Sequence, residues 1–223
     1  MIIHKYSNMY AGYELQVAVY SSLVCIVFAG STSSYLHSKN KLIDLEIVKK
    51  YFLYVSAGCF FGIYILEHTS AEILEIVYSI ILIILAILLI SDAKVIKDNI
   101  KALHKIGSLY FFGNGTISSL MGIGGGTLSV PYLSFIINDI KKSIATASAI
   151  GLIIAITSLI YMIILNANIF IEKINHLSLM ILIPTSILGS YTGVYLLKVI
   201  NPMKVKNIFS TLLLIVAFYL LID

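Results

Sequence analysis

Long charge-free intervals dominate the chain, and short polar segments separate them. A helix needs roughly 20 apolar residues to cross the hydrocarbon core of a bilayer, where each backbone polar group must be satisfied within the helix. Six intervals have the composition and approximate length of ordinary crossings, so the pattern predicts six full transmembrane helices. They are Leu15–Leu36, Tyr51–Leu66, Ile73–Ser91, Ser143–Leu165, Leu177–Leu197 and Val205–Ile222.

A seventh interval, from Ile106 to Asn138, is also uncharged but contains many helix-breaking residues. Glycine inside a helix costs about 1 kcal/mol relative to alanine, so a plain straight helix is not expected there. The interval is predicted either to cross once or to enter and return as a hairpin of two half-length helices. The interrupting residues are Gly113, Asn114, Gly115, Gly122, Gly124, Gly125, Gly126 and Pro131.

The lysines favour the hairpin. A single crossing divides them nine against six between the two sides, whereas a hairpin leaves only Lys5 and Lys173 on one side and the other thirteen of 15 on the opposite side. Lysine is enriched in cytoplasmic loops of membrane proteins. The sequence therefore predicts a hairpin that opens to the cytoplasm, with both termini on the other face.

The two halves of the chain match, which predicts an internal repeat. The hairpin between the halves inverts the second copy relative to the first, and a matching hairpin ahead of the first copy would lie upstream of Met1. We therefore expect residues 1–92 to form an incomplete first repeat, 93–105 a basic cytoplasmic linker and 106–223 the second repeat. The paired positions, at offsets of 127 and then 131, are Ala18 with Ala145, Ser21 with Ser148, Gly58 with Gly189, Gly62 with Gly193, Tyr64 with Tyr195, Leu66 with Leu197, Ser79 with Ser210 and Ala86 with Ala217.

Composition supports an all-α, polytopic transmembrane bundle in a lipid bilayer. Hydrophobic residues make up 59% of the chain and charged residues 12%, and the mean hydropathy is +0.99, which excludes a soluble domain. The net charge of +4 comes without any arginine or basic block, so no nucleic-acid partner is expected. Cys25 and Cys59 have no metal-ligand spacing and are expected to be packing residues, and no cofactor is expected.

The glycine segment is the candidate for solute binding. Irregular backbone at membrane depth persists only where it is buried in protein or lines a wet cavity. A half-helix that begins just after Gly126 would direct unpaired N–H groups and a positive dipole end at the membrane interior, which suits an anion. Pro131 would lie in its first turn. The predicted binding residues are Asn114, Thr116, Ser118, Gly122, Gly124, Gly125, Gly126, Thr127, Ser129 and Pro131, with Ser119 as a further donor.

Close helix packing is the alternative explanation for these glycines, because Gly-x-x-x-Gly spacing lets helix backbones touch in lipid. It is the favoured interpretation for Gly58 with Gly62 and for Gly189 with Gly193. It accounts less well for Gly122–Gly126, since packing does not require three adjacent glycines.

The same segment resembles the sulfite exporter TauE/SafE-like transporters. Their glycine-led Gly-x-Gly-Gly-Gly run and following proline and leucine correspond here to Gly122, Gly124–Gly126, Pro131 and Leu133, and an Ala-x-x-Ser element follows at Ala145–Ser148. The resemblance covers nearly the whole chain from about Glu14. It implies a multi-spanning permease for sulfite, sulfonates or related sulfur or carboxylate anions. Members of that family carry the glycine segment in both halves, whereas this sequence contains it once.

The sequence leaves three functions to distinguish. The first is a secondary transporter, or permease, for a small anion in the bacterial cytoplasmic membrane. The second is a truncated non-transporting remnant or one piece of a split transporter, whose bundle pairs with itself or with a companion chain that supplies the missing segment. The third, an intramembrane enzyme, is disfavoured because no Ser–His pair or paired carboxylates occur inside a span. No catalytic residue and no ATP-binding loop is identified, and the residues with ionisable side chains near span ends are expected to be interfacial: His37, His68, His104, His176, Glu67, Glu72 and Glu75.

Overall fold

The computed structural model describes residues 14–90, 100–137, 139–173 and 176–196, together with residues 211, 214, 215 and 218. Within these ranges the chain is helical and contains no strand, which confirms the all-α prediction. The helices are α2 (Glu14–Lys39), α3 (Leu45–His68), α4 (Ala71–Ile90), α5 (Ile100–Met121), α6 (Gly126–Ile137), α7 (Ile140–Lys173) and α8 (His176–Leu196).

Five of the six predicted crossings coincide with α2, α3, α4, α7 and α8. In the described part of the chain, three helical segments are long and apolar enough to cross a membrane: Gln16–Lys39, Ile140–Leu165 and Ser178–Leu196. The sixth predicted crossing, Val205–Ile222, falls largely outside the described residues. Large apolar side chains such as Leu53, Ile164 and Met180 are at least 70% exposed, as expected for a surface that faces lipid instead of water.

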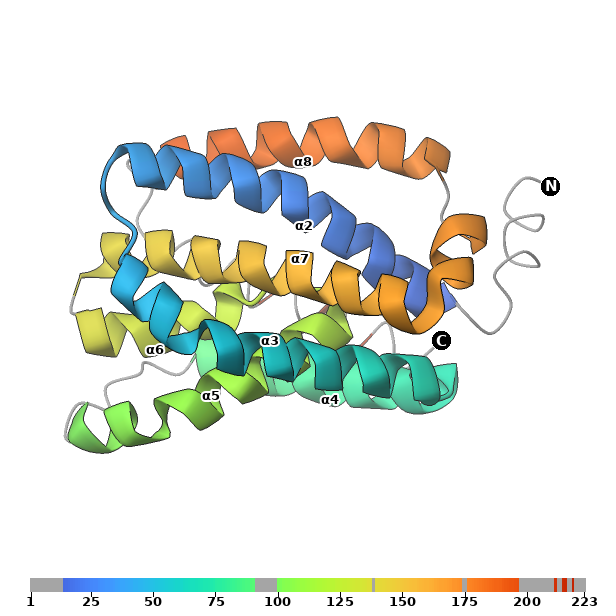
Figure 1. Ribbon diagram of the computed structural model, residues 1–223, viewed down its shortest axis with the longest axis horizontal. Helices are drawn as coiled ribbons and strands as arrows, with labels where there is room; N and C mark the ends of the chain where they lie inside the picture. Colours follow the sequence, from blue (N-terminus) through green and yellow to red (C-terminus); the bar gives the residue numbers. More distant parts are fainter. Residues whose placement is uncertain are drawn as a thin grey trace.

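The helices form a bundle centred on α2 and α7, which run side by side (Figure 1). Helix α8 packs on α2, α3 packs on α7, and α5 packs on α3, while the short α6 lies along α7. One buried cluster joins α2, α3 and α4 around Tyr20, Leu66 and Leu74. A second cluster joins α3, α5 and α7 around Phe111 and Ile154, so the hairpin is part of the core.

Two aspartates fix the turns at one end of the bundle. Asp44 caps α3 by accepting hydrogen bonds from the amides of Glu46 and Ile47, both 3.1 Å long, which is the usual role of an N-cap carboxylate. The Asp44 amide donates to Thr146 Oγ1 on α7 at 3.0 Å. Asp139 caps α7 in the same way. The turn before α3 is thereby fastened to the start of α7.

The glycine interval folds as a hairpin whose two outer ends lie at this same end of the bundle (Figure 1). The prediction of two half-length helices is wrong for the first arm, because α5 has 22 residues and continues through Gly113 and Gly115. A Cβ on Gly115 would lie 2.3 Å from the carbonyl oxygen of Val55. Close backbone contact with α3 thus compensates the low helix propensity of this glycine. The second arm, α6, has 12 residues.

Candidate functional site

The chain reverses direction between the two arms of the hairpin over four residues, 122–125. Three of these residues have a backbone geometry that favours glycine. The φ angles of Gly122, Gly124 and Gly125 are +65°, +71° and +67°, in the left-handed region that other residues adopt only at a cost of about 1–2 kcal/mol. Ile123 N–H donates to the Ser118 carbonyl at 3.1 Å, which closes α5 with a Schellman motif. Helix α6 then begins at Gly126, one residue before the predicted start.

The turn lies deep inside the bundle and is enclosed by protein. Ser22 of α2 donates its hydroxyl to the Gly122 carbonyl at 2.7 Å. A Cβ on Gly151 of α7, near the middle of the apolar span Ile140–Leu165, would lie 2.2 Å from the Gly124 carbonyl oxygen. Both central helices therefore contact the turn at membrane depth, where irregular backbone survives only with such cover.

Three buried polar side chains connect the two arms of the hairpin at the turn. Asn114 Nδ2 donates to Ser129 Oγ at 2.7 Å, and Ser118 Oγ donates to Asn114 Oδ1 at 2.8 Å. A Cβ on Gly125 would lie 3.4 Å from both Asn114 Oδ1 and Ser118 Oγ. The structure thus brings together Asn114, Ser118, Gly125 and Ser129 from the predicted binding residues.

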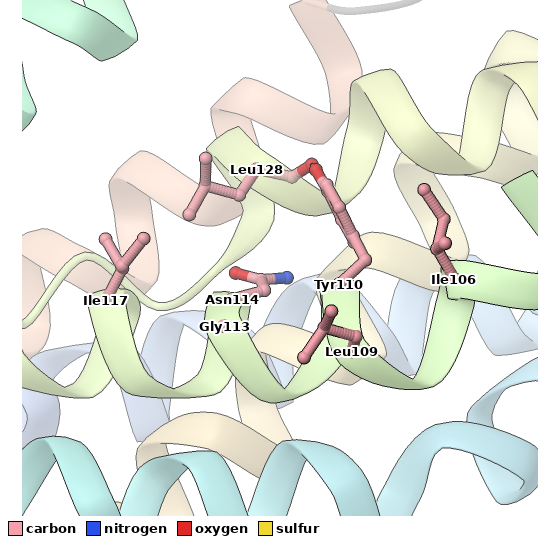
Figure 2. Close-up of a pocket in the computed structure, with 7 residues that line it drawn as sticks. All are labelled: Ile106, Leu109, Tyr110, Gly113, Asn114, Ile117 and Leu128. Atoms are coloured by element: carbon pink, nitrogen blue, oxygen red, sulfur yellow. The ribbon is translucent and has the colours of Figure 1, made fainter.

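A pocket of about 350 Å³ opens between α5 and α6 beside this cluster (Figure 2). Its walls are mostly apolar, and Asn114 is the lining residue that carries a side-chain amide. The Tyr110 hydroxyl donates to the Leu128 carbonyl across the hairpin, and the Tyr110 ring stacks on Tyr132 at 4.3 Å between centroids. The lining residues are Ile106, Leu109, Tyr110, Gly113, Asn114, Ile117 and Leu128.

Other predicted binding residues lie elsewhere. Thr116 donates its hydroxyl to the Phe112 carbonyl of its own helix at 3.0 Å, and its backbone faces Gly58 and Gly62 of α3. Ser119 also faces α3, where it donates to the Cys59 carbonyl at 3.4 Å.

The remaining predicted residues belong to the turn and to α6. Gly122 and Gly124 contact α2, while Gly126 has open space at its Cβ position among the described residues. The expectation that Pro131 lies in the first turn is wrong, because it is the sixth residue of α6. Thr127 is the second residue of α6, and its side chain is outside the described part of the structure.

Three residues that the sequence interpretation did not select also shape this region: Tyr110, Ser22 and Gly151. Tyr110 lies one helical turn before Asn114, so the i and i+4 spacing on a continuous helix would have placed both on one face. Ser22 and Gly151 belong to α2 and α7, and their contacts with the turn depend on tertiary packing that no local pattern encodes.

The arrangement is suited to a small anion. The first N–H groups of a helix have no partner within the helix and carry the positive end of its dipole, and those of α6 begin beside the neutral donors Asn114, Ser118 and Ser129. Among the described residues there is no group of three or more His, Cys, Asp or Glu that could hold a metal ion. The side chains that meet at the turn, Asn114, Ser118 and Ser129, are uncharged hydrogen-bonding groups.

Comparison with known proteins agrees with these features. The family model described as sulfite exporter TauE/SafE matches residues 7–220. The chain is 22% identical over 245 aligned positions to the "Probable membrane transporter protein YunE" of Bacillus subtilis (strain 168), with 100% of this chain and 87% of the relative covered. No solved structure gives a significant match. The chain therefore belongs to the sulfite exporter TauE/SafE family, a family of membrane transporters.

Proposed function

We propose that this transporter carries a small anion such as sulfite, a sulfonate or a related sulfur or carboxylate compound, by a secondary mechanism in the bacterial cytoplasmic membrane. The observation that supports this proposal is the interruption of the hairpin at Gly122–Gly125, which starts a new helix at membrane depth. The bound anion lies at the first turn of α6, close to Asn114.

The chemistry of the turn favours an anion over a cation. Amide N–H groups at a helix start attract negative charge, and the side chains that meet there, Asn114, Ser118 and Ser129, are neutral hydrogen-bonding groups. A cation site at this depth would instead be built from carboxylates or the carbonyl end of a helix.

The second candidate is a remnant without transport activity, or one piece of a split transporter. It is favoured by one specific observation, namely that the sequence contains the Gly-x-Gly-Gly-Gly segment once although its two halves match. The two candidates differ in whether the purified chain moves solute by itself.

Flux through proteoliposomes separates them. Vesicles that contain the purified chain are expected to take up sulfite faster than empty vesicles, and Gly125→Leu is expected to abolish the difference. The substitution forces a side chain into left-handed backbone with φ of +67°, at a site where even a Cβ would lie 2.2 Å from Ile154 Cδ1.

Gly30→Ala is the matched control. A Cβ on Gly30 would make ordinary contact with Leu152 at 3.4 Å, and the backbone there is not left-handed, so this variant is expected to retain uptake. Size-exclusion chromatography shows whether each variant is folded. Uptake by the folded parent chain that equals that of empty vesicles would favour the remnant or split transporter.

A further inference from the structure

The pocket between α5 and α6 is larger than a bare inorganic anion requires. Its volume of about 350 Å³ lies within the range of about 300–1,000 Å³ that is usual for small-molecule sites. A sulfite ion has four heavy atoms, and four water-sized units fill about 120 Å³. An anion bound beside Asn114 therefore leaves more than half of the pocket for another part of the solute.

The lining side chains place a polar group at one position and apolar groups around it. Figure 2 shows the Asn114 amide between Ile117 on one side and Tyr110 and Ile106 on the other. The Tyr110 hydroxyl donates to the Leu128 carbonyl, so this polar atom is engaged within the hairpin. The pocket thus suits a solute with a charged head group at Asn114 and a remainder that needs no hydrogen bonds.

Apolar walls discriminate between kinds of solute tail. A polar or charged group that moves from water to a site without hydrogen-bonding partners loses its hydration without compensation. An apolar group, in contrast, gains free energy by leaving water. A solute with an ammonium group or a second carboxylate at its far end is therefore disfavoured, and a solute with an alkyl tail is favoured.

Gly113 leaves the room for such a tail. It lines the pocket next to Asn114, and a Cβ built on it meets no atom of the described residues within 4 Å. Its φ angle is not in the left-handed region, so the backbone does not require glycine, and glycine lowers helix propensity. Gly115 differs, because it packs against α3. The missing side chain of Gly113 is therefore explained by the space that it leaves in the pocket.

We propose that the transported anion is amphiphilic, with its charged head group at Asn114 and the first turn of α6 and a short alkyl tail in the pocket, where Gly113 sets the size of the tail. This inference rests on the proposed function, from which it takes the position of the head group. It adds that the tail is apolar and that a residue of α5 outside the anion site determines specificity.

Titration calorimetry of the purified chain in lipid nanodiscs tests the proposal without a transport assay. The probes are methanesulfonate, hexanesulfonate and taurine, which share a sulfonate head group and differ in the tail. We expect hexanesulfonate to bind about tenfold more tightly than methanesulfonate, because each buried methylene group strengthens binding. Taurine, whose tail ends in an ammonium group, is expected to bind no more tightly than methanesulfonate.

Three variants separate the tail from the head group. Gly113→Leu is expected to remove the tenfold advantage of hexanesulfonate, and Gly113→Ala, which fills less of the pocket, to reduce it in part. Ala57→Leu is the matched control, because it adds the same side chain at an exposed position of α3 and is expected to retain the advantage. Asn114→Asp is expected to weaken the binding of both sulfonates by the same factor.

Equal binding of methanesulfonate and hexanesulfonate, or no binding of either, overturns the proposal; a lipid acyl chain that fills the pocket would give the first of these results. An advantage of hexanesulfonate that persists in both Gly113 variants also overturns it, because the tail would then lie elsewhere. Sulfite flux distinguishes this failure from failure of the proposed function. A chain that binds the sulfonates as expected but moves no sulfite contradicts transport alone, whereas a chain that moves sulfite and binds both sulfonates equally contradicts the apolar tail alone.

Discussion

Asn114 is one of the residues that connect the arms of the hairpin. Its amide donates to Ser129 on α6 and accepts from Ser118 on α5, and it is 3% exposed. Asn114 also lines the neighbouring pocket, where we propose that its amide meets the solute. Asn114 therefore combines a structural role with the proposed recognition of an anion.

We expect Asn114→Asp to weaken anion binding while preserving the fold. The new carboxylate has nearly the same shape and still accepts from the Ser118 hydroxyl, but it lacks the N–H group that donates to Ser129 and repels negative charge. An increase in the sulfite KM of about tenfold, equivalent to about 1.4 kcal/mol, is expected in the liposome assay. Thr116→Val is the control, because its hydroxyl bonds within α5, and an equal change in both variants would contradict the assigned role of Asn114.

The chemical types of the site residues could be predicted from the sequence, but their grouping could not. Asn114 and Ser118 are one helical turn apart and share a face, whereas Thr116 lies roughly 200° away around the helix and faces α3. This distinction requires the knowledge that α5 is continuous. In the sequence, Gly113 and Gly115 indicated a break in this helix. The packing of Gly115 on α3, which favours the continuous helix, is a tertiary effect that the sequence pattern does not show.

At the scale of elements, the contact between α3 and α5 depends on missing side chains. We expect Gly58→Ala to destabilise the protein by about 1–3 kcal/mol, since its Cβ would lie 2.1 Å from the Phe112 carbonyl oxygen and the helices would have to separate. Thermal unfolding in detergent measures the effect.

Gly113→Ala is the matched variant on the partner helix. It has open space at its Cβ position among the described residues, and alanine has the higher helix propensity, so its melting temperature is expected to be unchanged or higher. If Gly58→Ala were as stable as Gly113→Ala, close packing of α3 on α5 would be wrong.

The positions of helices were more predictable than the details of the break. Charge-free intervals locate α2, α3, α4, α7 and α8 to within eight residues at either end, because lipid tolerates few charges and requires long apolar runs. The start of α6 was also predictable from the run of glycines. The position of Pro131 was not predictable. Proline by itself suggested the first turn of a helix, whereas Pro131 is the sixth residue of α6.

At the scale of the whole molecule, the described lysines are concentrated at one end of the bundle. Lys39 and Lys41 adjoin the end of α2, Lys49 and Lys50 lie in the first turns of α3, and Lys141 and Lys142 lie at the start of α7. These segments meet at the end where α6 also terminates (Figure 1). This distribution supports the predicted orientation, with that end in the cytoplasm.

Cysteine labelling tests the orientation. In a chain with Cys25→Ser and Cys59→Ala, we expect Lys41→Cys to react with a membrane-impermeant maleimide in inside-out vesicles only. Ser70→Cys, in the turn between α3 and α4 at the opposite end, is expected to react in right-side-out vesicles only. The reverse pattern would show that the lysine distribution does not determine the orientation of this chain.

The contact of α2 with the glycine turn restricts how the two predicted repeats can tilt against each other in an alternating-access cycle. Ser22 touches one carbonyl of the turn, and Gly151 touches another two residues later. Gly151 and the turn belong to the same predicted repeat, so they move together. If the two predicted repeats tilt against each other, the Ser22 contact persists only when the rotation axis passes close to the turn. We therefore expect a solute at the first turn of α6 to stay nearly stationary near this axis, while access to it switches from one side of the membrane to the other.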